Sequence, residues 1–87
     1  MSEESVIEFP CAFPIKMMGR DTPEFRATAR SLIEGHVGPV AEDSIKSNLS
    51  GKGNFVSITI TVTATSQQQL DDIYREVSAH DDVLMAL

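Results

Sequence analysis

The residues of this chain that most readily do chemistry are one cysteine and two histidines, Cys11, His36 and His80. Nucleophilic catalysis needs a nucleophile and a base within hydrogen-bond reach of each other, and a metal site needs several ligands at characteristic spacing. The three residues are far apart in sequence, and no two have ligand spacing. We therefore expect no catalytic residue and no metal ligand. Cys11 is interpreted as a small apolar residue in or near the core, and each histidine as a cation near the carboxyl end of a helix.

The acidic residues favour solvated charge over acid–base catalysis. The paired carboxylates considered for such chemistry lie in the amino-terminal stretch, on the exposed face of a predicted helix and in a turn: Glu3, Glu4, Asp71, Asp72, Asp81 and Asp82. General acid–base catalysis relies on groups whose pKa is tuned by burial or by a neighbour, and none of these positions is expected to be buried. We expect the protein not to be an enzyme and to use no cofactor.

Two sets of cations are candidate contact points. The run GKG (Gly51–Gly53) does not match the phosphate-binding loop G-x-x-x-x-G-K-[ST] and joins two predicted strands, so a hairpin turn explains its glycines and leaves Lys52 as a candidate contact. Arg20, Arg26 and Arg30 lie in or before a predicted helix. They either hold a carboxylate or phosphate near the helix amino terminus or pair with nearby acidic residues, namely Glu24, Glu34 and the amino-terminal carboxylates. Ion pairing is the interpretation we favour.

The composition excludes several classes of partner. The 87 residues include 13 acidic and 7 basic side chains, for a formal net charge of −6. Nucleic-acid binding needs clustered Lys and Arg, and so does docking on an anionic membrane. The sequence has no apolar run of about 18 residues and no basic, then apolar, secretory signal. These features predict a cytoplasmic protein that binds neither nucleic acid nor membrane.

Periodicity and stop signals predict six elements after an amino-terminal arm of residues 1–11, of which Met1–Glu8 is expected to be mobile. Strands are predicted at 12–19, within 42–50, at 55–65 and within 81–87. Pro14 is expected at the start of its strand or at a bulge. One helix begins after Asp21 or Thr22, with Pro23 as its first residue, and the other begins with a capping box formed by Ser66 and Gln69.

The order βαββαβ predicts one ferredoxin-like domain over residues 12–87, an α+β sandwich. Its four-stranded antiparallel sheet has the strand order 4-1-3-2, with both helices on one face. In FVSITITVTAT (Phe55–Thr65) the apolar residues should face the helices, and the Ser/Thr row, including Thr59 and Thr61, should face the open side. This row either contacts solvent or lies under a partner or ligand, with Met18, Leu84 and Val6 as candidate apolar neighbours.

The stretches EFPCAFPIKMMGR, GKGNFVSITITVTAT and LDDIYREV…DDVLMAL resemble the YbeD family of small bacterial proteins over essentially the whole chain. That resemblance implies a ferredoxin-like fold similar to the ACT domains that sense amino acids, and it carries a contextual link to lipoate metabolism. ACT domains have an Asp-x-Pro-Gly turn after the first strand. Here Asp21 and Pro23 match that turn, but Glu24 replaces the glycine, which weakens the inference of amino-acid sensing.

The functional expectation is a non-enzymatic regulatory or protein-interaction module that forms a homo-oligomer, expected to be a dimer, through its sheet and that could also bind another protein. The alternative is a sensor of an amino acid or carboxylate, with its site in the loop between the first strand and the first helix. The candidate ligand or partner contacts are Gly19, Arg20, Asp21, Lys52, Thr59 and Thr61.

Overall fold

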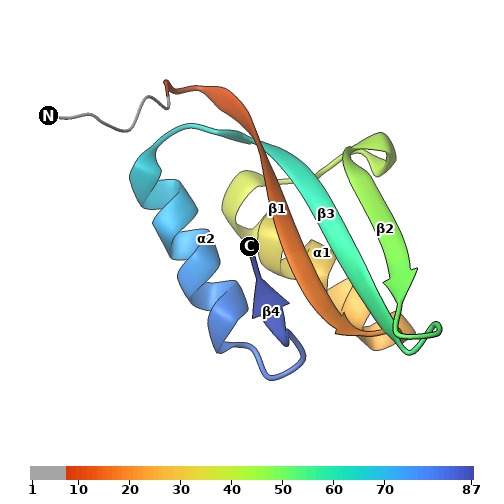
Figure 1. The fold of residues 1–87 in the computed structure, drawn as a ribbon. Coiled ribbons are helices and arrows are strands. Elements are labelled where there is room, and N and C mark those ends of the chain that lie inside the picture. The colour runs from red at the N-terminus through yellow and green to blue at the C-terminus, as the bar shows by residue number, and fades with distance from the viewer. Residues whose placement is uncertain (1–7) are drawn as a thin grey trace, which may run out of the picture.

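The computed structural model describes residues 8–87. The elements follow the predicted order, with one short 3₁₀ turn added before the second strand (Figure 1): β1 (Cys11–Arg20), α1 (Pro23–Val37), η1 (Glu42–Ser44), β2 (Ile45–Ser50), β3 (Phe55–Ala64), α2 (Gln67–Ala79) and β4 (Met85–Ala86). The predicted mobile arm, Met1–Glu8, lies outside the described residues except for Glu8. Phe9 packs against the core, and β1 begins at Cys11, one residue before the predicted start of the domain.

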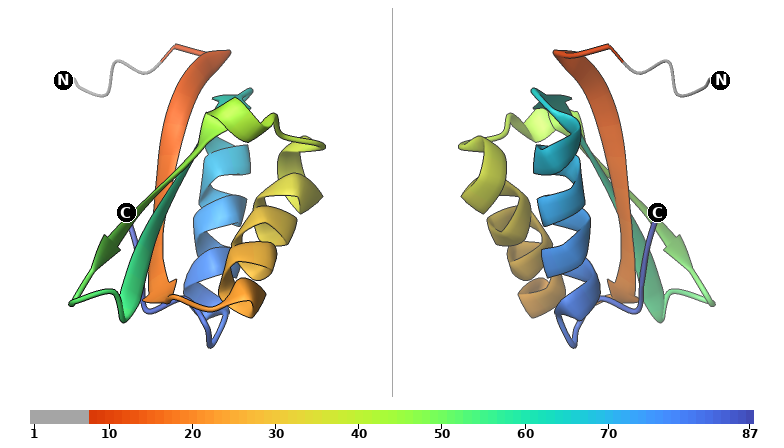
Figure 2. Two further views of the ribbon diagram at one scale, coloured as in Figure 1. Left: turned by 90° about the vertical axis from the view of Figure 1, so that its right-hand side faces the viewer. Right: turned by 90° about the vertical axis from the view of Figure 1, so that its left-hand side faces the viewer.

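The four strands form one antiparallel sheet with the order β2-β3-β1-β4, as predicted. The two central strands pair over ten residues, from Cys11 opposite Ala64 to Arg20 opposite Phe55. Both helices lie against the same face of the sheet, so the other face has no helix over it (Figure 2). This is the ferredoxin-like α+β arrangement. None of the helices formed by residues 8–87 is long and apolar enough to cross a membrane.

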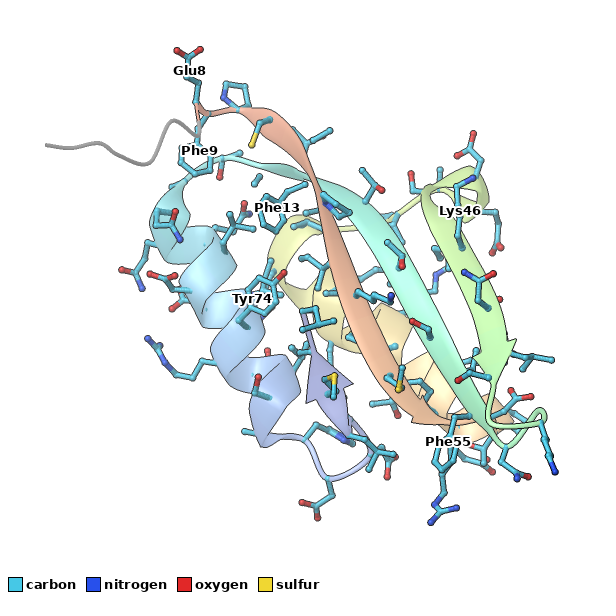
Figure 3. All side chains as sticks on the ribbon, in the orientation of Figure 1. Glu8, Phe9, Phe13, Lys46, Phe55 and Tyr74 are labelled. Atoms are coloured by element: carbon cyan, nitrogen blue, oxygen red, sulfur yellow. The ribbon has the colours of Figure 1, made fainter. Side chains whose placement is uncertain are left out.

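The core lies between the sheet and the helices, and it contains the alternating apolar residues of β3 predicted to face them. The buried hydrophobic side chains are Ile15, Met17, Phe25, Ala29, Ile33, Val56, Ile58, Ile60, Val62, Ala64, Leu70, Ile73, Val77 and Val83. Phe13 and Tyr74 pack edge to face at the margin of the core (Figure 3), with ring centroids 6.4 Å apart. The alternation of β3 therefore separates a dry side of the sheet from an open one.

The amino-terminal ends of both helices are capped by side chains that the sequence identifies. Thr22 Oγ1 accepts a hydrogen bond from the Phe25 backbone N–H at 3.0 Å, which satisfies one of the free amides of the first turn of α1. Ser66 Oγ does the same for the Gln69 N–H at 3.1 Å. The Gln69 side chain accepts from the backbone N–H of Thr65, at 2.9 Å, instead of that of Ser66, so the predicted capping box is shifted by one residue on its return bond.

Pro14 lies neither at the start of β1 nor at a bulge, so that prediction is wrong. It is the fourth residue of the strand and pairs in regular register with Thr61. Lys16 exchanges backbone hydrogen bonds with Leu87, and Met18 C=O accepts one from Leu84, so even-numbered residues of β1 direct their backbone groups toward β4. Because β4 pairs only near Met17 and Met18, no described strand lies beside Pro14 on that side. The missing N–H of proline therefore costs no ladder hydrogen bond.

The β2–β3 connection is the predicted hairpin turn. Gly51, Lys52 and Gly53 have positive φ angles of 60°, 59° and 87°, a region that glycine adopts without steric cost. A Cβ at Gly51 would also lie 2.6 Å from the Phe55 ring. The turn therefore explains both glycines, and Lys52 stands exposed at its tip.

Candidate interaction surface

The face of the sheet without helices is built from every second residue of each strand. The cross-strand register and the alternation of side chains along a strand place these residues on it: Ala12, Pro14, Lys16, Met18, Arg20, Lys46, Asn48, Ser50, Phe55, Ser57, Thr59, Thr61, Thr63 and Met85. We call this set the open face. The predicted Ser/Thr row of β3 runs along its centre, and no acidic side chain belongs to it.

Two lysines flank Thr59 on the open face. Lys16 of β1 and Lys46 of β2 are its directly opposite cross-strand neighbours, and both are exposed. Lys46 is labelled on β2 in Figure 3. Since adjacent strands lie about 4.8 Å apart, the two lysine Cα atoms are separated by roughly 10 Å. Thr59 is thus the middle of a cationic row that crosses the sheet.

The neighbouring row crosses the sheet through Ser57, with Met18 and Asn48 opposite it. Ser57 is only 6% exposed, and its hydroxyl has no hydrogen-bond partner among residues 8–87. Met85 lies opposite Met18 on β4. This row is therefore more apolar and more closed than the lysine row beside it.

An arginine and an apolar margin complete the open face. The Arg20 guanidinium lies over the Phe55 ring, 5.6 Å from its centroid, which is a cation–π distance. Leu84, Met85 and Leu87 are 57%, 51% and 63% exposed. Met18 is the predicted apolar neighbour that lies on this face, whereas Leu84 borders a cleft described below and Val6 lies outside the described residues.

The ion pairs of the described chain all lie on helices or loops, away from the open face. Arg26 pairs with Asp21 at 2.8 Å, and Arg75 pairs with Asp72 at 3.2 Å. Within residues 8–87, no carboxylate lies within ion-pair distance of the cations on the open face. The predicted pairing of Arg26 and Arg30 is confirmed, although Arg26 takes Asp21 as its partner and not Glu24. These two arginines and Arg20 do not gather around one anion site.

Arg30 and Glu34 hold the loop that follows α1. Glu34 Oε2 accepts hydrogen bonds from the Val40 backbone N–H at 3.0 Å and from Arg30 Nε at 3.2 Å, and these lower the pKa of the Glu34 carboxyl. Arg30 also donates to Glu42 at 2.6 Å and to the Val40 carbonyl at 3.1 Å. Its hydrogen bonds to Glu42 and Glu34 raise the pKa of Arg30. The role of this pair is structural.

The outer edge of β2 is a second open feature. Even-numbered β1 residues direct their backbone groups toward β4, so the odd-numbered ones bond to β3. Carried across β3 by the cross-strand register, this alternation leaves the backbone groups of the odd-numbered β2 residues, Ile45, Ser47 and Leu49, pointing away from β3. Figure 1 shows β2 as the outermost strand, with nothing beyond it among the described residues. Leu49 has the parity of the helix-facing residues and yet is 60% exposed. The edge therefore combines free backbone groups with an exposed apolar side chain.

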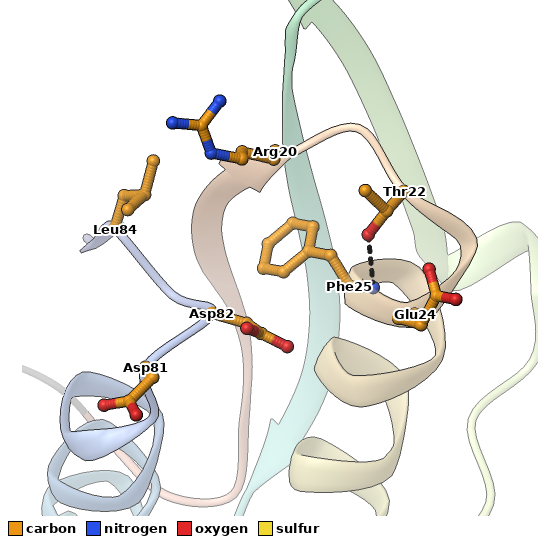
Figure 4. Close-up of a pocket in the computed structure, with 7 residues that line it drawn as sticks. All are labelled: Arg20, Thr22, Glu24, Phe25, Asp81, Asp82 and Leu84. Atoms are coloured by element: carbon orange, nitrogen blue, oxygen red, sulfur yellow. Dashed lines mark hydrogen bonds between the residues drawn. The ribbon is translucent and has the colours of Figure 1, made fainter.

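A cleft of about 380 Å³ opens beside the loop between β1 and α1, where the alternative sensing site was predicted. Its lining residues are Arg20, Thr22, Glu24, Phe25, Asp81, Asp82 and Leu84 (Figure 4). One cation and three carboxylates line it, so a simple anion meets more repulsion than attraction there. The loop between α2 and β4, which supplies Asp81, Asp82 and Leu84, was missed as a contributor because only the tertiary fold brings it to this end of the sheet.

The predicted site residues separate into different roles. Gly19 is buried, and a Cβ there would lie 2.6 Å from the Phe25 ring and 2.7 Å from the Asp82 carbonyl oxygen, so the residue is needed for packing. Asp21 is committed to Arg26. Only Arg20 of these three residues combines exposure with a place on both the cleft and the open face.

The remaining candidates lie on or near the open face. Thr59 is between the two lysines, whereas Thr61 is exposed opposite Pro14 and borders a smaller cleft of about 180 Å³ beside the loop after α1. Lys52 is at the hairpin tip, away from both. Sequence reasoning missed Lys16 and Lys46, although each is one residue from a helix-facing isoleucine of its strand (Ile15 and Ile45) and therefore lies on the same face as the threonines.

Cys11 and the two histidines make structural contacts within the fold. Cys11 is partly buried, is not disulfide-bonded and packs against the core. His36 Nε2 lies 2.6 Å from Glu76 Oε1, joining the last turn of α1 to α2. His80 caps the end of α2, and its Nδ1 accepts from the Asp82 N–H at 3.1 Å. In the part of the chain that the structure describes, no group of three metal-ligand residues comes together.

Comparison with known proteins places these features in a family context. The family model described as "Protein of unknown function (DUF493)" matches residues 4–87. A UPF0250 protein of Paraburkholderia phytofirmans is 43% identical over 84 residues, covering 97% of this chain and 94% of that protein. Another from Leptothrix cholodnii is 45% identical over 85 residues, covering 98% and 93%.

A solved structure supports the fold independently. The solution structure of protein HP0495 from H. pylori superposes with a TM-score of 0.74 at 20% identity, covering 99% of this chain and 90% of that one. At this identity the likeness bears on the fold alone. The sequence matches confirm the resemblance to small bacterial proteins of the YbeD type, and the chain belongs to the DUF493 (UPF0250) family.

Proposed function

We propose that this protein is a non-enzymatic regulatory or protein-interaction module that self-associates through its sheet, with the outer edge of β2 as the contact between two copies. The observation that carries the proposal is Leu49, 60% exposed on a strand whose outward backbone groups have no partner in the described chain. Edge strands with these features readily add another strand.

The geometry of β2 suits pairing with its own copy. In an antiparallel pairing centred on Ser47, the outward backbone groups of the two strands meet, and Ile45 lies opposite Leu49 of the second copy. The helix-facing sides then remain on one face, and the exposed Leu49 gains an apolar neighbour. On the other face Lys46 lies opposite Asn48 of the second copy, so no two like charges meet.

Stacking two open faces is the less favourable arrangement. It would bring Lys16, Arg20 and Lys46 of both copies together without carboxylates from the strands, and like charges in close contact repel. The edge contact avoids this repulsion and leaves the open face available.

Size-exclusion chromatography with light scattering tests the proposal on Ser47→Pro. Proline removes an outward N–H and leaves the β3 ladder intact, so the monomer should fold while the dimer is lost. Ser47→Ala keeps the N–H and is the matched control. Edge pairing alone buries a small area, so self-association should depend on concentration. A wild-type chain that stays monomeric when concentrated, or one whose dimer survives Ser47→Pro, would contradict the proposal.

The cleft beside the β1–α1 loop favours a second candidate, a sensor of a small ligand. Arg20 on one side and Asp81 and Asp82 on the other would suit the carboxylate and the amine of an amino acid better than a simple carboxylate. Thermal-shift measurements with amino acids, lipoate and short fatty acids test it, since a specific ligand raises the melting temperature. Arg20→Ala should abolish the shift and Arg75→Ala should keep it. Unchanged melting with every compound would remove this candidate.

A further inference from the structure

The distribution of charge on this molecule is uneven in a way that its net charge conceals. The chain carries −6 overall, yet the only charged side chains of the open face are Lys16, Arg20 and Lys46. The other described cations, apart from Lys52 at the hairpin tip, are paired with carboxylates on the helix side or in loops. The open face is therefore a local cationic surface on an acidic protein.

The positions of these cations give the surface a definite shape. Lys16 and Lys46 extend from opposite sides of Thr59, and Arg20 lies two rows away over Phe55. Between the lysine row and the arginine row lies the apolar row of Met18, bordered by Met85 on β4. A complementary partner therefore presents carboxylates that flank an apolar side chain.

From this juxtaposition we infer that the open face binds an acidic segment of another protein, with carboxylates on Lys16 and Lys46 and an apolar side chain against Met18 and Met85. The exposed apolar side chains of Met85, opposite Met18, and Leu87, opposite Lys16, supply contact area that a purely ionic site lacks. A nucleic acid fits less well, because a long polyanion would meet three cations on this face and the repulsion of the acidic remainder.

The inference goes beyond the proposed self-association and does not require it, since the open face and the outer edge of β2 use different groups. Ser47→Pro is therefore a suitable background for the experiment, because it should remove the edge contact and keep the open face. The probe is a synthetic peptide in which glutamates alternate with valine and leucine, compared with the same peptide carrying glutamine for every glutamate.

The measurement is a titration of the full ¹⁵N-labelled chain, wild type and Ser47→Pro, followed by amide shifts. We expect the glutamate peptide to shift amides of the open face around Lys16, Thr59 and Lys46, and the glutamine peptide to bind much more weakly. Raising the salt from about 50 mM to about 500 mM should weaken binding, because exposed charges are screened.

Two double variants distinguish an effect of cations at this site from an effect of the protein's net charge. Lys16→Gln with Lys46→Gln removes two cations from the open face, and Lys52→Gln with Arg75→Gln removes two from elsewhere. Both change the net charge equally. The first should weaken the glutamate peptide about 3- to 30-fold, as expected for two exposed ion pairs, and the second less than about twofold.

Each contrary result overturns the inference in a recognisable way. Equal binding of the glutamine peptide, shifts confined to the helix side, or no binding of either peptide at millimolar concentration would show that the open face is no acidic-segment site. An oligonucleotide that displaces the peptide would make nucleic acid the partner. If amide shifts of the open face appeared when the Ser47→Pro variant was concentrated without peptide, the occupant would be a second copy of the chain. If the double variant Glu3→Gln with Glu4→Gln changed the same amide shifts, the occupant would be the chain's own acidic segment. Dimerisation of the wild type without peptide binding would leave the proposed function intact.

Discussion

The two sides of the sheet in this protein differ in the polarity of their side chains and in their exposure to solvent. The side that faces α1 and α2 is apolar and dry, with Ile15, Ile60 and Ile73 inaccessible to solvent. The open side carries hydroxyls, cations and a few exposed apolar groups. Stability therefore depends chiefly on the covered side, because apolar burial is the dominant favourable contribution to folding. The open side is freer to carry residues suited to binding.

The strongest test of this comparison uses two adjacent residues of β3 that point to opposite sides. Ile60→Ala should lower the free energy of unfolding by about 2–5 kcal/mol, because it leaves a cavity in the dry core. Thr61→Ala on the open side should change it by less than about 1 kcal/mol. Urea unfolding measures both. Similar losses for the two variants would mean that the open side is as important to stability as the covered one.

The next test concerns the end of β1, where Gly19 lies in close contact with Phe25 and Asp82. Gly19→Ala should cost about 1–3 kcal/mol, because the added methyl meets the Phe25 ring and the Asp82 carbonyl, and the carbonyl belongs to backbone that cannot turn aside.

Gly35→Ala is the matched control for Gly19→Ala. Gly35 is an exposed residue of α1, and a Cβ there meets nothing within 4 Å. Alanine should therefore stabilise the helix by up to about 1 kcal/mol. If Gly19→Ala proved as harmless as Gly35→Ala, the end of β1 would not be in close contact with the Phe25 ring of α1 and the loop between α2 and β4.

Ser57 is the exception to the comparison, a polar residue of the open side that is nevertheless buried. Its hydroxyl lacks a partner within residues 8–87, and an unsatisfied buried group costs about 1–3 kcal/mol. Ser57→Ala should therefore raise the free energy of unfolding by roughly 1 kcal/mol, measured by thermal or urea unfolding. Thr63→Ala, exposed on the same strand, should give no such gain. A destabilised Ser57→Ala would show that the hydroxyl is satisfied.

Particular residues show why the fold followed from the sequence and most of the surface did not. The alternation of Val56, Ile58 and Ile60, together with the Thr22 and Ser66 caps, is local information that specifies strands, helices and their faces. The lining of the cleft depends on which loops the fold brings together, because Arg20 and Leu84 are far apart in sequence, and periodicity cannot reveal it. Arg26 and Asp21 are only five residues apart, but the choice of Asp21 over Glu24 is a matter of side-chain geometry, which periodicity does not give either.

Lys16 and Lys46 are intermediate between the elements, which the sequence predicts, and the surface contacts, which it does not. The alternation within each strand shows which face each lysine occupies, but their arrangement on either side of Thr59 depends on the register of three strands. The prediction that Thr59 faces the open side is confirmed, but the two lysines beside it were not predicted. The packing role of Gly19 and the ion-pair role of Asp21 depend on contacts with other side chains and backbone, which residue spacing alone does not show.

The smallest expected effect comes from the rim between the two sides, at Glu34. The Val40 N–H and the Arg30 guanidinium lower the pKa of this carboxyl, so ionised Glu34 stabilises the folded chain. A lowered pKa contributes stability that is present above the ordinary carboxyl pKa of 4.5 and is lost as the pH falls through the folded value. Glu34→Gln should therefore be less stable than wild type at neutral pH, and the difference should shrink below about pH 4. Thermal unfolding at several pH values measures it, with Asp43→Asn, an exposed acid of η1, as the control for removing one negative charge elsewhere. If the difference in stability between Glu34→Gln and wild type were constant with pH, the contacts of Glu34 with Val40 and Arg30 would hold the loop after α1 without any contribution from the charge of the carboxylate. The border between the two sides of the sheet would then add no electrostatic contribution to the comparison.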